Sequence, residues 1–135
     1  MRAAILPVAA FLCLAGPAGG ADDIAAAQNV IRSQEQALSR DDAASAYSYA
    51  APVIRQLFPE ASIFMFMVQQ SYAPVYRHRS FEFGEARAEG DAIAQRVSIV
   101  DENGQAWEAL YTLERQADGT LKITGCTLLK AGQSA

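Results

Sequence analysis

The spacing of apolar residues changes midway along the chain, from a helical period to a strand period. Between residues 22 and 71 apolar positions recur every three or four residues, as at Ile24, Ala27 and Ile31, which is the spacing of one helix face. Beyond residue 79 apolar and polar residues alternate, as they do in strands with one buried face. The pattern predicts an α+β protein in which helices precede a sheet.

Capping residues and prolines divide the helical half into four segments. Asp22 and Asp23 can cap the first helix, and Asp41 or Asp42 the second, because a carboxylate suits the unpaired N–H groups and the positive end of a helix dipole. Pro52 ends the second helix and begins a short third one, and Pro59 begins the fourth. The expected helices cover residues 22–38, 42–50, 52–58 and 59–71.

Three short segments between the alternating stretches each place glycine third, at Gly90, Gly104 and Gly119. Glycine takes the left-handed position in three-residue hairpin loops, so these segments predict tight connections in an antiparallel meander. A two-residue Asn103-Gly104 turn is the alternative for the middle loop. The expected strands cover residues 79–87, 92–100, 106–115 and 121–129.

Three-residue loops give the sheet one almost wholly apolar face, and the need to bury such a face favours this register. The pairs on it are Ile93 with Leu113, Val97 with Ala109, Ile99 with Trp107, Leu113 with Ile123, and Trp107 with Leu129. The first strand adds Arg79, Phe81, Phe83 and Glu85 to this face, with Phe83 opposite Gln95. Gly125 faces Tyr111, and Leu110, Cys126 and Leu128 lie on the opposite, outer face.

The first 21 residues are typical of a secretory signal peptide. Arg2 supplies a positive end, an apolar run follows, and Gly19-Gly20-Ala21 offer small residues for cleavage. The apolar run is too short to span a bilayer as a helix, and an uncleaved anchor is the alternative. We expect a periplasmic or secreted protein with a single domain over residues 22–130, a flexible tail over 131–135, and no membrane span after signal removal.

Charge and residue inventory narrow the chemistry. The chain has a net charge of −4 and no basic stripe, which argues against nucleic acid as a partner. One histidine, His78, and one cysteine of the expected mature chain, Cys126, cannot build the usual nitrogen and sulfur shell of a metal site. We therefore predict no metal and no cofactor.

Five short segments of the chain together carry a resemblance to a known family. They are Gln-Asn-Val-Ile-Arg-Ser-Gln at 28–34, Tyr-Ala-Pro-Val-Tyr-Arg at 72–77, Ser-Phe-Glu-Phe-Gly at 80–84, Leu-Tyr-Thr-Leu-Glu at 110–114 and Gly-Cys at 125–126. In them the chain resembles the exported bacterial family called domain of unknown function 4864. The resemblance implies the nuclear-transport-factor-two-like, or cystatin-like, cone of helices packed in a curved sheet, and it implies no activity.

A few polar and aromatic residues are expected around the open end of such a cone. Arg79 can place a fixed positive charge at the edge of an apolar cavity, which suits a small amphiphile with a carboxylate head. The alternative is that Arg79 pairs with Glu60 or Glu82 and closes the cone. The predicted ligand-binding residues are Tyr72, Tyr76, Arg79, Phe83, Gln95, Trp107 and Tyr111.

Three functions fit this sequence. The first is a non-catalytic module that binds a small ligand or another protein. The second is an isomerase-like or cyclase-like enzyme, in which Glu85 acts as the acid or base and Tyr111 or Tyr76 as the oxyanion donor. The third is a structural module that forms a homodimer through the outer sheet face, where Leu110, Cys126 and Leu128 are expected.

Overall fold

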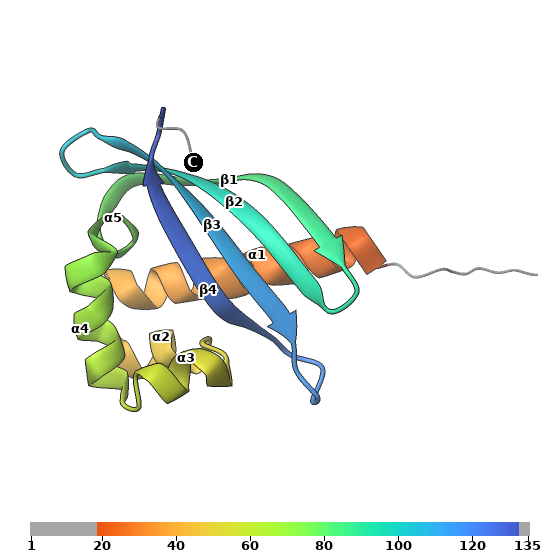
Figure 1. Ribbon diagram of the computed structural model, residues 1–135. Helices are drawn as coiled ribbons and strands as arrows, with labels where there is room; N and C mark the ends of the chain where they lie inside the picture. Colours follow the sequence, from red (N-terminus) through yellow and green to blue (C-terminus); the bar gives the residue numbers. More distant parts are fainter. Residues whose placement is uncertain (1–18, 133–135) are drawn as a thin grey trace, which may run out of the picture.

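The computed structural model describes residues 19–132; residues 1–18 of the predicted signal peptide and residues 133–135 of the predicted tail lie outside them. Within the described residues, five helices precede four strands (Figure 1). The helices are α1 (Gly19–Ser39), α2 (Ala43–Ser48), α3 (Pro52–Leu57), α4 (Ala61–Ser71) and α5 (Ala73–Tyr76). The strands are β1 (His78–Glu89), β2 (Ala92–Asp101), β3 (Ala106–Arg115) and β4 (Leu121–Lys130).

The strands form one antiparallel sheet in the order β1-β2-β3-β4. Figure 1 shows α1 lying across one face of the sheet, with α2, α3 and α4 gathered beside β4. The segment before α3 covers part of the edge of β4, because Ala51 N donates to Ile123 O at 2.8 Å and Ile123 N donates to Tyr49 O at 2.8 Å. The predicted class, α+β with N-terminal helices on a four-stranded antiparallel sheet, is confirmed.

Local sequence signals account for most helix boundaries. Asp42 caps α2 by accepting a hydrogen bond from Ser45 N at 3.0 Å, as N-cap carboxylates do. Pro52 stands in the first turn of α3, where its missing N–H costs nothing. The short helix α5 lies where the sequence predicted only a linker, because Pro74 supports one turn in its first positions.

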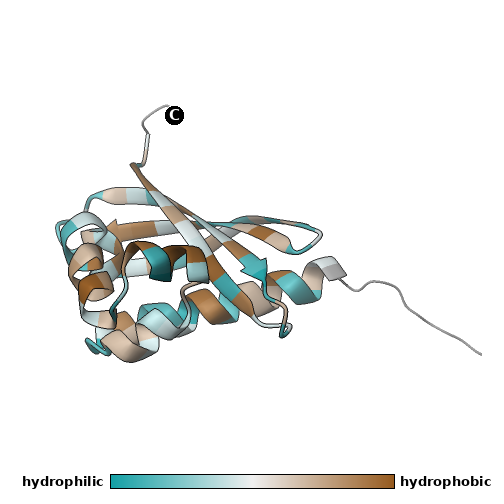
Figure 2. Cartoon of the chain, turned by 60° about the horizontal axis from the view of Figure 1, so that its bottom comes forward, coloured by the Kyte–Doolittle hydropathy of each residue, from teal (hydrophilic) through white to brown (hydrophobic). Residues whose placement is uncertain are grey.

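The register between β2 and β3 agrees with the prediction. Ile93 faces Leu113, Val97 faces Ala109 and Ile99 faces Trp107. Gly104 has a φ of 85° in the predicted three-residue loop, a conformation that favours glycine over other residues. Every second residue of β2 from Ile93 to Ile99 is buried, and Figure 2 shows hydropathy varying from residue to residue along the strands.

The register of β1 differs from the prediction. Gly90 and Asp91 form a two-residue turn between Glu89 and Ala92, with Gly90 at a φ of 59°. A bulge between Phe83 and Ala86 then places Phe83 opposite Val97, not opposite Gln95. The extra residue of a bulge turns the following side chains to the other face.

Two residues of β1 therefore leave the face predicted for them. Glu85 has a side chain that is 86% exposed, and it approaches Arg96 at 3.8 Å. A second irregularity, between His78 and Ser80, accompanies an exposed Arg79. The prediction that both residues look into the core is wrong, because each lies at a bulge that the alternating pattern does not reveal.

A third bulge, between Thr112 and Leu113, makes the pairing of β4 with β3 differ from the prediction. Cys126 now faces Tyr111, and Gly125, which the sequence placed there, faces Thr112. Leu128 and Cys126 pack against the core and do not lie on the outer face as predicted. Beyond the bulge, Trp107 faces Lys130 in place of Leu129, whereas Leu113 still faces Ile123 as predicted.

Candidate functional site

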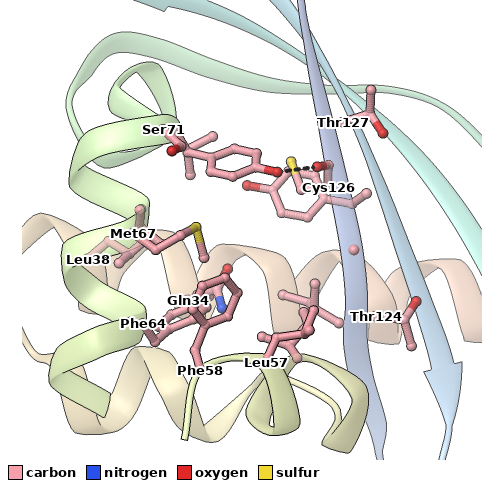
Figure 3. Close-up of a pocket in the computed structure, with 17 residues that line it drawn as sticks. Gln34, Leu38, Leu57, Phe58, Phe64, Met67, Ser71, Thr124, Cys126 and Thr127 are labelled. Atoms are coloured by element: carbon pink, nitrogen blue, oxygen red, sulfur yellow. Dashed lines mark hydrogen bonds between the residues drawn. The ribbon is translucent and has the colours of Figure 1, made fainter. Parts of the chain in front are cut away.

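A pocket of about 560 Å³ opens between the helices and the last two strands (Figure 3). Helix α4 contributes Phe64, Met67 and Val68, which share one side of that helix because they stand three to four residues apart. Figure 3 shows the side chains of Phe64 and Met67 projecting from α4 toward β4. The wall is mainly apolar, as small-molecule sites usually are.

The mouth of the pocket is formed by the short helix α3, the end of α4 and β4. Leu57 lines the pocket although the residue is 69% exposed. Ser71 and Thr127, which are exposed, line it from α4 and β4. A molecule can therefore enter from solvent without the displacement of a helix.

Tyr111 and Cys126 bring polar groups to the strand side of the pocket. The two residues face each other across β3 and β4. Burial raises the pKa of Tyr111 well above its usual value and raises the pKa of Cys126 to about 12. Both groups are therefore neutral near pH 7, and the thiol is a poor nucleophile there, since the thiolate is the reactive form.

Tyr72 closes one end of the pocket. Its hydroxyl donates to the carbonyl oxygen of Cys126 at 2.9 Å, and burial raises the pKa of Tyr72. This bond satisfies a carbonyl group on β4, the last strand of the sheet. Tyr72 thereby holds the end of α4 against β4.

Gln34 is the polar residue that α1 contributes to the pocket. The residue is only 6% exposed, and its side-chain amide nitrogen donates to Ala46 O at 3.1 Å. The sequence offered a signal for it, because Gln34 interrupts the apolar stripe formed by Ile31 and Leu38 on the same helix. Our sequence prediction did not include it.

Only two of the seven predicted binding residues line this pocket. Tyr72 and Tyr111 do so. Phe83 lies under Arg32, whose guanidinium carbon is 4.8 Å from the ring centroid. Gln95 is fully buried away from the pocket, where it accepts a hydrogen bond from Gln28 at 3.0 Å.

The other three predicted residues are also elsewhere. Tyr76 donates its hydroxyl to Asp41 at the surface, and this bond is the main cause of its raised pKa. Arg79 lies against Gly104 in the loop between β2 and β3, and no ion pair joins it to Glu60 or Glu82 within the described residues. Trp107 donates to Asp101 Oδ2 at 2.9 Å near the same loop. Their part in ligand binding stays a prediction, but they do not form one cavity with Tyr111.

No aspartate, glutamate, lysine, arginine or histidine lines the pocket within the part of the chain that the structure describes. The same residues contain no group of three or more His, Cys, Asp or Glu side chains arranged to hold a metal ion. Between residues 19 and 132, no helix has the combined length and apolar character needed to cross a bilayer. The polar groups that face the pocket are amide, hydroxyl and thiol groups.

The chain matches the family described as Domain of unknown function (DUF4864) over residues 21–135 and belongs to it. Its fold is similar to that of an NTF-2-like protein of unknown function from Silicibacter pomeroyi DSS-3, with a TM-score of 0.57 and 13% sequence identity. The match covers 82% of this chain and 97% of that protein. No curated protein matches the chain significantly. The comparisons therefore identify the family and the NTF2-like fold, and they assign no activity.

Proposed function

We propose that this protein is a non-catalytic binding module that holds a small apolar molecule in the pocket between α4 and β4. The observation that carries the proposal is the pocket itself, which has a volume of about 560 Å³ and a mainly apolar wall. Burial of an apolar molecule there would be favourable by roughly 25 cal/mol for each Å² removed from water. The open mouth at Leu57 supports exchange with solvent.

The enzyme alternative lacks its central residue. A carboxylate with a raised pKa has to sit in a dry pocket to act as a base beside an oxyanion donor. Glu85, the predicted carboxylate, is 86% exposed and approaches Arg96, and the described residues that line the pocket include no acid. This chemistry favours binding over catalysis.

The outer sheet face, through which a homodimer was predicted, carries fewer apolar residues than expected. Of the three apolar residues predicted there, Cys126 and Leu128 pack against the core, and Leu110 remains. The nearby side chains of Arg96, Glu85 and Glu108 are charged. Dimerisation through this face stays a prediction with little apolar surface behind it.

Binding of N-phenyl-naphthylamine, a neutral dye that fluoresces in apolar surroundings, tests the proposed function. We expect saturable binding to the wild type and about tenfold weaker binding to Met67→Trp, because the indole would occupy the space of the ligand. Phe66→Trp is the matched control, since Phe66 is 63% exposed on the same helix and does not line the pocket. Absence of dye binding to the wild type, or equal loss in both variants, would refute the proposal.

A further inference from the structure

The amide oxygen of Gln34 is a buried acceptor that is free to bind a ligand. Gln34 Nε2 donates to Ala46 O at 3.1 Å, and no residue between 19 and 132 donates to Gln34 Oε1. Gln34 is only 6% exposed, and it lines the pocket. Figure 3 shows it beside Phe58 and Phe64 among the lining side chains.

The orientation of this amide follows from its partner. A backbone carbonyl can only accept a hydrogen bond, so the NH₂ group of Gln34 has to face Ala46 O. The two ends of the amide cannot be exchanged without placing two oxygens against each other. The oxygen is therefore the end of Gln34 that is left for a molecule in the pocket.

Tyr111 supplies a complementary donor to the same pocket. Its hydroxyl belongs to a residue that is only 2% exposed, and Cys126 faces it on β4. A thiol is a weak acceptor compared with oxygen, so an oxygen atom of a ligand is a better partner for this hydroxyl than the neighbouring sulfur. The pocket thus presents one strong acceptor, Gln34 Oε1, and one donor whose neighbour on β4 is a weak acceptor.

We propose that the pocket selects neutral apolar molecules that carry a hydroxyl group, whose hydrogen is bound by Gln34 Oε1 and whose oxygen accepts from Tyr111. A hydroxyl is both donor and acceptor, so its hydrogen matches Gln34 Oε1 and its oxygen matches the Tyr111 hydroxyl. The inference rests on the proposed binding function and adds the chemical class of the ligand.

Charged ligands fit this site poorly. A carboxylate would place its negative charge near Gln34 Oε1, and the described lining residues include no cation that could pair with it. Burial of an unpaired charge is costly. Arg79, which the sequence suggested for a carboxylate head, lies against Gly104 outside this pocket.

Ligands without a donor also fit less well. Water can satisfy Gln34 Oε1 when the pocket holds no ligand, and a ligand that displaces this water without replacing its hydrogen bond loses affinity. A methyl ether therefore lacks the hydroxyl hydrogen that the parent alcohol can donate to Gln34 Oε1. The difference between the two compounds measures the contribution of Gln34.

Competition against the dye tests the ligand class with naphthol, its methyl ether and naphthoate, all substituted at the same ring position. We expect naphthol to bind the wild type about tenfold more tightly than the ether and naphthoate to bind most weakly. In Gln34→Met the ratio of alcohol to ether affinity should fall to about one. Gln36→Met is the matched control, because Gln36 is exposed on the same helix, and it should keep the wild-type ratio.

Each outcome bears on one of the two proposals. Equal affinity of alcohol and ether for the wild type, a preference that persists in Gln34→Met, or tightest binding of naphthoate would overturn the ligand class while the pocket remains a binding site. Failure of the dye and all three compounds to bind would overturn the binding function as well. If circular dichroism shows that Gln34→Met does not fold, Tyr111→Phe decides: it should weaken the binding of naphthol, whose oxygen loses its donor, and an unchanged naphthol affinity would count against the inference.

Discussion

A single indole group organises the loop between β2 and β3. Trp107 Nε1 donates to Asp101 Oδ2 at 2.9 Å, while Asp101 Oδ1 accepts from the backbone of Asn103 and Gln105, each at 2.9 Å. The indole bond is the largest cause that lowers the pKa of Asp101, and the backbone bonds and the charge of Arg79 act in the same direction against the effect of burial. Trp107 and Arg79, which were predicted to bind a ligand, thus interact with Asp101 at the loop between β2 and β3.

Trp107→Phe should raise the pKa of Asp101 toward its usual value, because it removes the strongest of these hydrogen bonds. A carboxyl group with a lowered pKa in the folded state stabilises the protein above its unfolded pKa of about 3.9, and this contribution is lost as the pH falls through the folded pKa. The wild type should therefore lose more stability than the variant on acidification below about pH 4. Carbon NMR of the carboxyl groups measures the shift.

Asp118 is the internal control for that titration. Its pKa is lowered by bonds from Thr120 in the loop between β3 and β4, and Trp107 takes no part in them. Its titration should be the same in both proteins. An Asp101 pKa that Trp107→Phe leaves unchanged would show that the indole does not control it.

At the scale of elements, a mostly buried hydrogen bond between Glu35 and His78 fastens the junction of α5 and β1 to α1. Glu35 Oε2 lies 2.6 Å from His78 Nε2, and the two side chains are 14% and 10% exposed. His78 Nδ1 donates to Pro74 O at 2.9 Å, and Glu35 Oε1 accepts from Arg32 at 2.5 Å. Every polar atom of the two side chains has a partner, as buried polar groups usually do.

Glu35→Leu should lower the free energy of unfolding by about 1–3 kcal/mol, because it leaves the buried His78 Nε2 without its hydrogen-bond partner. Arg40→Ala is the control at the exposed pair of Arg40 with Asp42, and it should cost less than about 1 kcal/mol. Urea denaturation of both variants compares them. A smaller loss in Glu35→Leu than in Arg40→Ala would mean that the pair does not fasten the junction.

Elements with local signals could be predicted from the sequence, whereas bulges could not. Asp42, Pro52 and Gly104 act through their own backbone geometry, so they fixed a helix cap, a helix start and a loop in advance. A bulge depends on packing against the helices, and each one turns the residues beyond it to the other face. For this reason the sequence placed Glu85 in the core and Cys126 on the outer face.

The candidate site was predicted in part for the same physical reason. Tyr72 precedes the sheet, and Tyr111 lies on β3 in a stretch whose pairing with β2 is regular. No bulge therefore turns either residue away, and both line the pocket. The inward position of Cys126 depends on the bulge at Thr112. Gln34 lies on a helix that was predicted correctly, but its free amide oxygen follows from the contact of α1 with α2 at Ala46, which periodicity does not give.

At the scale of the whole molecule, the start of α1 is tied to the end of β3. The carboxylate of Asp23 accepts a hydrogen bond from Arg115 of β3, and Asp22 lies in the first turn of the helix. Ala27 and Ile31, which follow on the same face, are buried in the core. The contacts of α1 with the sheet described here therefore begin after the expected cleavage point at residue 21.

The predicted signal peptide can consequently be removed without loss of these contacts. We expect expression of the full sequence in a bacterium to give a periplasmic protein whose N-terminus lies at or near Asp22, because the small residues Gly19 to Ala21 suit cleavage there. Mass spectrometry of the periplasmic and membrane fractions measures this. A chain that starts at Asp22 should have a melting temperature close to that of a chain that starts at Gly19, the first residue of α1, since Asp22 can then serve the first turn of the helix. An intact chain beginning at Met1 in the membrane fraction would instead favour an uncleaved anchor, and a large fall in melting temperature would mean that residues before Asp22 contribute to the fold.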